Sequence, residues 1–383
     1  MPRLLSLFMF VNFVVGTSAF VLTGIVADVA TSLRTSVAAA GQAMTIYAVA
    51  TALLAPLLLL ATGRWQRKRA LMLALLLFTA GNALCALAPD LMTLYAGRVL
   101  MGLGAMATPV MSALAVALVE PQRRARALAY VFLGVSLSYV AGIPVGAWLG
   151  SAYGWQTPVW AAAAASALAL LAVWQLVPAE MDAPGASFAG LGAVLARGPI
   201  AASMLLTMLY FTAIFVVFSY AGPVLRALVP MDATQLSLTL AAFGLAGVAG
   251  TLVGGRASDH FGARRTLSVQ LGLLASMMAL LPLTAGQPVW MLLVLLLWAG
   301  AGFGMMAPLQ GRLAQLAGPQ TPLVLSLNGS MLYLGTALGA AVGGAASVAI
   351  GFDKVAWVGL PFALAGWVVL MLSTRAPLVA KPA

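Results

Sequence analysis

Ionisable side chains are scarce in this sequence, and nearly all lie at the ends of long apolar stretches or between them. The exception is Arg98, which follows Asp90 by about eight residues and so lies roughly 12 Å further along a helix. An arginine cannot serve as a proton carrier, because its guanidinium stays protonated. It can bind an anion, bridge polar groups of neighbouring helices, or perturb a carboxylate such as that of Asp28. The eight acids are Asp28, Asp90, Glu120, Glu180, Asp182, Asp232, Asp259 and Asp353.

The sequence offers no constellation for catalysis, a metal or a cofactor. The single histidine, His260, falls in a polar segment where a solvated role is expected, and the single cysteine, Cys85, permits neither an internal disulfide nor a metal cluster. No pair of acids lies deep in an apolar stretch, and neither a phosphate-binding loop nor a soluble nucleotide domain is recognisable. We therefore expect a protein that is not an enzyme and needs no cofactor.

Neutral polar and aromatic residues inside the apolar stretches predict a mainly apolar pocket with a few polar anchors. Packing or lipid contact is the alternative role for each of them. With Arg98, the candidate substrate-binding residues are Asn12, Thr17, Phe20, Tyr47, Tyr139, Tyr210, Phe215, Trp298, Asn328 and Tyr333.

The composition indicates that the solvent of this chain is the lipid bilayer. Of its 383 residues, 63% are hydrophobic and 7% are charged, against about 25% charged in a soluble domain. The net charge of +11 does not indicate a nucleic-acid partner, because the cations lie in short runs between apolar stretches.

Twelve apolar stretches are long enough to cross the membrane as helices, which satisfy their own backbone hydrogen bonds in lipid. The first is too long for the core of a secretory signal and is expected to remain in the protein. In chain order we expect spans at 4–26, 41–60, 70–88, 91–118, 127–150, 158–177, 199–221, 235–254, 266–284, 290–310, 323–350 and 355–373.

The distribution of lysine and arginine predicts that both termini are cytoplasmic. With that orientation, Arg34, Arg226 and Lys354 lie on the opposite side and Arg98 lies within span four. The remaining fifteen cations are cytoplasmic: Arg3, Arg64, Arg67, Lys68, Arg69, Arg123, Arg124, Arg126, Arg197, Arg256, Arg264, Arg265, Arg312, Arg375 and Lys381.

A polar interruption near the middle of the chain divides it into two halves of six spans. We expect an N-terminal six-helix bundle at 1–178, a cytoplasmic linker at 179–198 and a C-terminal six-helix bundle at 199–383. The linker is too short to bury a core of its own. The expected fold is therefore an all-α integral membrane protein built of two pseudo-symmetric six-helix bundles.

Two features recur in both halves. The segments after spans two and eight, at 63–69 and 255–265, are short, glycine-led and basic. Spans five and eleven carry small residues at every fourth position, which allows a neighbouring backbone to approach closely. This stripe predicts either tight packing or a seam on which helices slide, and its residues are Gly134, Ser138, Gly142, Gly146 and Gly150 in span five and Gly335, Gly339 and Gly343 in span eleven.

These motifs resemble those of the major facilitator superfamily, in particular its bacterial drug- and sugar-efflux branch of twelve-helix antiporters. The segment after span eight resembles the family's signature Gly-x-x-x-Asp-x-x-Gly-x followed by two residues that are each arginine or lysine, which implies a latch on the cytoplasmic face. Arg98 and Gly102 resemble the span-four motif that the family links to proton coupling, and the glycines around Pro144 resemble the span-five antiporter signature. The resemblance implies coupling or gating roles for Arg98, Gly102, Gly142, Pro144, Gly146, Gly255, Asp259, Gly262, Arg264 and Arg265.

The chain departs from the family pattern at three places. The first-half copy of the signature, Gly63 to Arg69, contains no aspartate, and Ile143 stands where the family often has a glycine before the proline. Ala19 lies where many efflux members carry an acid in span one. The sequence therefore shows no obvious proton carrier inside the membrane.

The sequence predicts a secondary transporter that moves small organic compounds, amphipathic and neutral or anionic, by alternating access between two halves. Efflux with proton antiport is one form of this activity. A uniporter or importer of a neutral solute such as a sugar or nucleoside is the alternative, and a non-transporting sensor or scaffold of the same fold is another. We expect a monomer in the bacterial inner membrane whose partners are its substrate, lipid and, in the antiport form, protons, and not nucleic acid.

Overall fold

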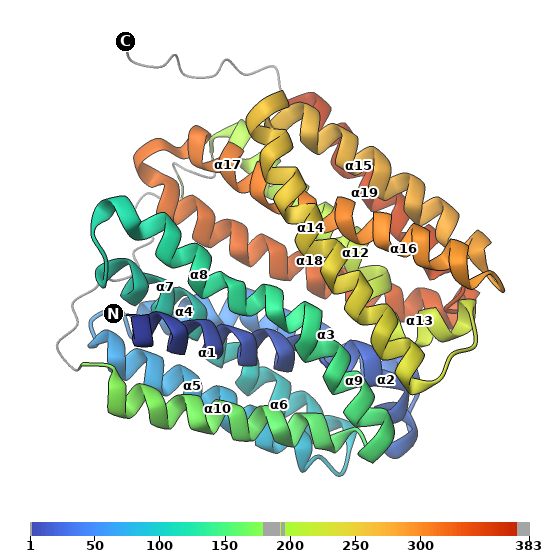
Figure 1. Cartoon of the computed structure of the whole chain (residues 1–383), viewed down its shortest axis with the longest axis horizontal. Coiled ribbons are helices and arrows are strands. Elements are labelled where there is room, and N and C mark those ends of the chain that lie inside the picture. Colours follow the sequence, from blue (N-terminus) through green and yellow to red (C-terminus); the bar gives the residue numbers. More distant parts are fainter. Residues whose placement is uncertain (1, 179–191, 193–195, 374–383) are drawn as a thin grey trace. The chain divides into compact units, whose positions relative to one another are not determined.

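The computed structural model describes residues 2–178, 192 and 196–373, and within these ranges every element is a helix or a helical turn (Figure 1). Twelve helices are long and apolar enough to cross a membrane. This confirms the expected all-α class with twelve spans.

The chain folds as two compact units. The first comprises residues 1–187 with 221–223 and 231–241, and the second comprises 188–220, 224–230 and 242–383. The predicted linker lies mostly outside the described residues, which resume at 196 and enter a helix at Gly198.

The helices of the first unit pack around α1 and α6. In Figure 1, α1 lies beside α8 and α10, while α6 packs against α3 and α5. The elements are α1 (Pro2–Phe20), α2 (Leu22–Ser32), α3 (Val37–Val49), η1 (Ala50–Leu54), α4 (Ala55–Ala61), α5 (Arg67–Ala86), α6 (Leu91–Gly104), α7 (Ala107–Ala117), η2 (Pro121–Arg123), α8 (Arg124–Leu137), η3 (Ser138–Gly142), α9 (Ile143–Tyr153) and α10 (Gln156–Leu176).

The helices of the second unit pack around α12, which contacts both α18 and α19. Its elements are α12 (Gly198–Phe218), α13 (Ala221–Leu228), α14 (Ala233–Phe261), α15 (Ala263–Leu280), η4 (Leu281–Thr284), α16 (Pro288–Gly304), α17 (Met306–Ala317), η5 (Gly318–Gln320), α18 (Thr321–Ile350) and α19 (Val355–Leu372). The beginnings of α13 and α14 cluster with the first unit.

Prolines explain two local changes of helical geometry. Spans two and five each contain a π-helical turn, η1 and η3, and each turn directly precedes a helix with proline at its start, Pro56 and Pro144. Proline cannot donate the usual backbone hydrogen bond and its ring crowds the preceding turn. A wider π turn accommodates the ring within a continuing span, and such turns often occur at functional sites.

Span one is interrupted without a proline, and it is not the continuous helix expected over 4–26. The helix α1 ends at Phe20, Val21 separates it from α2, and α2 continues to Ser32. As a result Asp28 lies within a helix rather than at its end. The side chains that take up the carbonyl groups at this break are described below.

Polar side chains cap the beginnings of spans two, four and eight. Ser36 and Asp90 accept hydrogen bonds from backbone N–H groups three residues on. Asp232 and Gln235 form a reciprocal pair at the start of α14, with distances of 2.8 and 3.0 Å. These bonds satisfy N–H groups that a helix leaves without internal partners. The three caps belong to helix ends that we expect on the non-cytoplasmic side.

Candidate functional site

Arg98 is carried by α6, whose glycines let it pack closely between spans two and three. A Cβ atom at Gly102 would lie 3.0 Å from the backbone nitrogen of Thr51, and one at Gly104 would lie 2.7 Å from the carbonyl oxygen of Ala74. Neither position has room for a side chain. The glycines of the span-four motif therefore set how deeply α6, and with it Arg98, sits in the first unit.

The Arg98 guanidinium joins α6 to the break in span one. Its Nη1 atom donates to the carbonyl oxygens of Ser18 and Ala19, each at 3.2 Å, and Thr23 Oγ1 donates to the Phe20 oxygen at 2.8 Å. Carbonyl groups in the last turn of a helix lack internal donors and carry partial negative charge. Arg98 thus caps the C-terminus of α1.

The environment of Arg98 is enclosed and contains no counter-ion among the described residues. The side chain is 2% exposed, and its guanidinium carbon lies 5.9 Å from the centre of the Tyr47 ring, which is within cation–π range. The described structure shows no ion pair between Arg98 and a carboxylate. The bridging role between helices that the sequence allowed is therefore seen, made through carbonyl groups rather than an acid.

The other candidate residues of the first unit make three separate kinds of contact. Asn12 is fully buried and held inside the unit, because it donates to the Val131 oxygen at 3.1 Å and accepts from Thr108 Oγ1 at 3.0 Å. Phe20 and Tyr139 stack with ring centres 5.5 Å apart. Thr17 lies against Gly142, and its hydroxyl oxygen is buried without a hydrogen-bond partner.

In the second unit the candidates form part of a continuous aromatic cluster. Ring contacts with centres 4.7 to 5.8 Å apart connect α12, α14 and α16, and the participants are Tyr210, Phe211, Phe215, Phe218, Phe243, Trp298 and Phe303. Asn328 is bonded within the unit, where its Oδ1 accepts from Thr207 Oγ1 at 2.6 Å. Tyr333 is half-buried on α18.

Trp298 stands before two glycines of span ten at the same spacing as Arg98 before two glycines of span four. This correspondence was not noted in the sequence analysis. The spacing Arg98, Gly102, Gly104 is repeated as Trp298, Gly302, Gly304. Trp298 is also 2% exposed, and its indole N–H is buried without an acceptor. Each unit therefore carries an enclosed N–H donor in its fourth span. The donor on α6 of the first unit is charged, and the donor on α16 of the second unit is neutral.

A second buried group that the sequence analysis missed is Gln270 on α15. Its amide lies where α14 and α16 approach most closely. A Cβ atom at Gly254 would lie 2.7 Å from Gln270 Nε2, and one at Gly250 would collide with Gly300. Gln270 Oε1 is buried without a donor. A glutamine inside an otherwise apolar span was the signal that could have identified it.

The small-residue stripes of spans five and eleven both face the first helix of their own unit. In span five, a Cβ atom at Gly150 would lie 2.7 Å from the Ile25 side chain, and Gly142 abuts Thr17. In span eleven, Cβ atoms at Gly335 and Gly339 would each lie 2.8 Å from a phenylalanine Cβ of α12. The stripe is therefore a site of close packing inside each unit, and sliding along it stays a hypothesis.

The glycine-led, basic segment 255–265 is helical, although the expected spans end at 254 and begin again at 266. The helix α14 continues to Phe261 and α15 begins at Ala263, so only Gly262, with φ of 83°, breaks the helical path. Glycine is favoured there because L residues with side chains rarely adopt positive φ. Asp259 and His260 are exposed in the last turn of α14, and the described structure shows no ion pair between Asp259 and Arg264 or Arg265.

Charges around this turn oppose the helix dipoles. An acid in the last turn and bases in the first turn each lose roughly 0.3–1 kcal/mol relative to neutral residues. Asp259 stands near the C-terminus of α14, and Arg264 and Arg265 stand at the start of α15. Helix stability therefore does not account for these charges, which favours a role in contacts formed during function.

In the first-half copy, basic residues bind backbone carbonyl groups instead of an acid. Arg67 donates to the Gly63 oxygen and Lys68 donates to the Trp174 oxygen at the end of α10, both at 2.7 Å. These bonds cap helix C-termini, which cations stabilise. They give a physical account of how this copy functions structurally without an aspartate.

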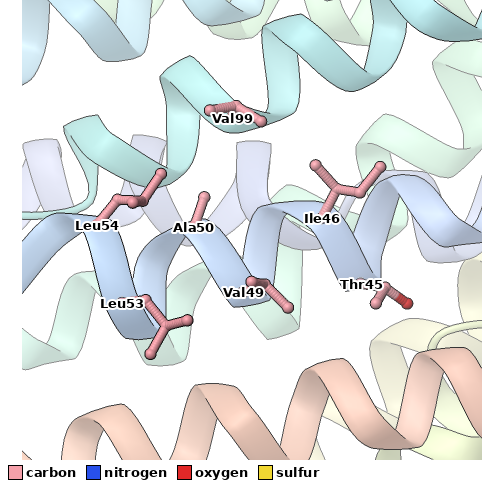
Figure 2. Close-up of a pocket in the computed structure, with 7 residues that line it drawn as sticks. All are labelled: Thr45, Ile46, Val49, Ala50, Leu53, Leu54 and Val99. Carbon is pink, nitrogen blue, oxygen red and sulfur yellow. The ribbon is translucent and has the colours of Figure 1, made fainter.

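An apolar groove on span two does not contain any of the candidate residues (Figure 2). Ile46, Ala50 and Leu54 point from α3 and η1 towards Val99 of α6, whereas the side chains of Thr45, Val49 and Leu53 point away from it. The only polar side chain in it, Thr45, is already bonded to Gln42 at 2.9 Å. The groove offers hydrocarbon contact and no polar anchor, so we do not assign it to a polar substrate.

Comparison with known proteins identifies the family. The model of the Major Facilitator Superfamily matches residues 8–230 and 204–383. The chain is 30% identical to the inner membrane transport protein YdhP of Escherichia coli K12, over 95% of this chain and 94% of that protein. It is also 30% identical to the MFS-type transporter YbcL of Bacillus subtilis 168, over 91% and 90% of the two chains.

A solved structure with the same fold is that of a bacterial homologue of the human lysosomal transporter Spinster, in an inward-facing and occupied conformation. The TM-score is 0.83 at 15% identity, and the alignment covers 100% of this chain and 99% of that one. The matching fold, the family model and the two relatives agree. The chain belongs to the major facilitator superfamily of membrane transporters.

Proposed function

We propose that this protein is a secondary transporter of the efflux branch, which exports small amphipathic organic compounds by alternating access. It acts as a monomer in the bacterial inner membrane with both termini in the cytoplasm. The observation that carries the proposal is the buried Arg98, which links span four to the break in span one. Burying an arginine within a membrane span costs free energy, and arginines found there generally mark functional sites.

The buried groups of both units support a substrate with few polar atoms. Arg98 and Trp298 each keep an enclosed N–H group without an acceptor. Trp298 packs against the Phe243 ring with ring centres 5.4 Å apart, and such rings suit apolar and aromatic compounds. A neutral or anionic compound fits these groups better than a cation, because both are hydrogen-bond donors and Arg98 is positively charged.

Proton antiport is the form of energy coupling that we propose to test first. The test reconstitutes the protein in proteoliposomes and measures the flux of a panel of amphipathic compounds with and without an imposed pH gradient. Antiport predicts flux that the gradient accelerates and that collapse of the gradient with an ionophore abolishes. Flux that ignores the gradient would support the uniporter or importer alternative instead.

The same assay separates a transporter from a protein without transport activity. Absence of flux across the whole panel would favour a sensor or scaffold of the same fold. The variant Arg98→Ala is expected to reach the membrane normally but to lose most or all of the flux, because it removes the capping of α1. Wild-type flux in this variant would remove Arg98 from the mechanism.

A further inference from the structure

Only some of the N–H donors of the Arg98 guanidinium have hydrogen-bond acceptors within the fold. A guanidinium presents five N–H donors in a fixed plane. The Nη1 corner is used, because it donates to the oxygens of Ser18 and Ala19. The Nε atom is buried without an acceptor, and Nη2 forms no hydrogen bond among the described residues. The edge formed by Nε and Nη2 is therefore open.

This open edge has the geometry that binds a carboxylate. The parallel N–H bonds of a guanidinium edge match the two oxygens of a carboxylate, and such bidentate pairs are among the stronger hydrogen bonds in proteins. A single capping corner at α1 does not require an arginine, because a lysine ammonium also donates to carbonyl oxygens. Lysine lacks this planar edge. Capping of α1 therefore does not explain why an arginine, and not a lysine, stands at position 98.

The charge of Arg98 is only partly compensated by what surrounds it. The C-terminus of α1 supplies a partial negative charge, and the Tyr47 ring lies at 5.9 Å. No carboxylate among the described residues pairs with the guanidinium. Removing an ion from water without a full counter-charge is unfavourable. An anionic ligand would supply both the missing charge and the missing acceptors.

From these contacts we infer that Arg98 binds the oxyanion of the transported compound through its Nε–Nη2 edge, which makes the substrate class organic anions, carboxylates foremost. This inference rests on the proposed function and narrows it. The side chain is 2% exposed in this structure, so the anion reaches it in a conformation in which the surrounding helices have separated. The same guanidinium then connects the bound anion to the last turn of α1, next to the break at Val21.

The experiment compares acids with their amides, which have nearly the same shape but no charge. The purified full-length protein is titrated with 2-naphthoate and 2-naphthamide, and with indole-3-acetate and indole-3-acetamide. Binding is followed by isothermal titration calorimetry and by the shift in Tm. We expect each acid to bind at least roughly tenfold more tightly than its amide, since hydrogen bonds to a charged group contribute more than neutral ones.

Two variants connect the preference to the edge. Arg98→Lys keeps the charge and a donor for the α1 carbonyls but removes the planar edge, and it should lose most of the preference for the acid. Arg34→Gln removes an exposed cation of the same unit and should leave the preference unchanged. If Arg98→Lys does not fold, equal or tighter binding of the amides by the wild-type protein still overturns the assignment.

The outcomes keep this inference separate from the proposed function. Equal or tighter binding of the amides in both pairs, or an unchanged preference in a folded Arg98→Lys variant, would overturn the assignment of the edge. Flux of neutral compounds in the proteoliposome assay would still support a transporter in that case. If neither acids nor neutral compounds are transported in the proteoliposome assay, the proposed function itself fails, even if the acids bind to the protein.

Discussion

Arg98 illustrates how one side chain can carry a structural and a functional role at different atoms. Its Nη1 corner caps α1, and its Nε–Nη2 edge has no partner among the described residues. In the second unit Trp298 holds the corresponding position with a neutral donor. The pair indicates that the two halves share a sequence pattern in their fourth spans while differing in the charge of the donor at this position.

Asp90 provides a test of capping at the residue scale. Its carboxylate accepts from the backbone N–H of Thr93 at 2.8 Å, and this hydrogen bond lowers the pKa of the carboxyl below its ordinary value. A group whose pKa is depressed by folding stabilises the protein above its unfolded pKa, and this stabilisation is lost as the pH falls through the folded pKa.

We therefore expect Asp90→Ala to lower Tm at neutral pH, with the difference from wild type shrinking as the pH is lowered through the titration of the carboxyl. Asp90→Asn, which also caps helices well, should stay closer to wild type at neutral pH. Thermal unfolding in detergent across a pH series measures both. A deficit of Asp90→Ala that is constant down to strongly acidic pH would show that capping by the carboxylate is not its cause.

At the scale of elements, helix pairs are held together by backbone approaches that only glycine permits. The pairs α1 with η3 and α9, α12 with α18, and α14 with α16 each meet at glycines whose Cβ atoms would collide with a neighbour. Inside a bilayer, water cannot drive helices together, so close van der Waals packing carries much of the association. These contacts hold the helices of each unit closely together.

The helix α18 contains a matched pair of glycines that tests this packing. A Cβ atom at Gly339 would lie 2.6 Å from the Thr212 oxygen, whereas nothing lies within 4 Å of one at Gly329. Gly339→Leu should therefore destabilise the second unit by roughly 1–3 kcal/mol or more, as overpacking does, and Gly329→Leu should change stability little. The measurement is Tm and monodispersity after solubilisation. Equal behaviour of the two variants would argue against tight packing at the stripe.

At the scale of the whole molecule, transport requires each unit to change its exposure while remaining folded. The turn at Gly262 joins α14 to α15 through a single residue and carries charges that oppose both helix dipoles. Because these charges do not stabilise the helices that bear them, we expect them to act in the conformational cycle.

This expectation is tested with Asp259→Asn, which removes the charge without changing the shape. We expect the maximal rate of flux to fall several-fold while the apparent affinity for substrate stays near that of wild type, since Asp259 is exposed and lies far along α14 from the aromatic cluster. Flux kinetics in proteoliposomes separate the two quantities. A loss of affinity at an unchanged maximal rate would contradict a role in gating.

The amino-acid sequence alone predicts twelve membrane spans, a lipid environment for them and a single arginine, Arg98, inside a span. These follow from the length of apolar stretches and the expense of a charge in lipid, which are local properties that any reader of the chain can evaluate. The π turns at Pro56 and Pro144 had a visible cause in the prolines, although the geometry they adopt was not predicted.

The contacts between residues that are distant in the sequence became visible in the fold. The fold placed the Ser18 and Ala19 carbonyls at Arg98, turned the glycine stripes towards α1 and α12, and left one edge of the guanidinium and the Trp298 indole without acceptors. The break in span one contains no proline, so there is no local signal for it in the sequence. The carbonyl groups of Ser18 and Ala19 at this break accept hydrogen bonds from Arg98, about eighty positions away in the chain. Contacts between distant residues depend on how whole helices pack, and helical periodicity in one segment does not encode its neighbour.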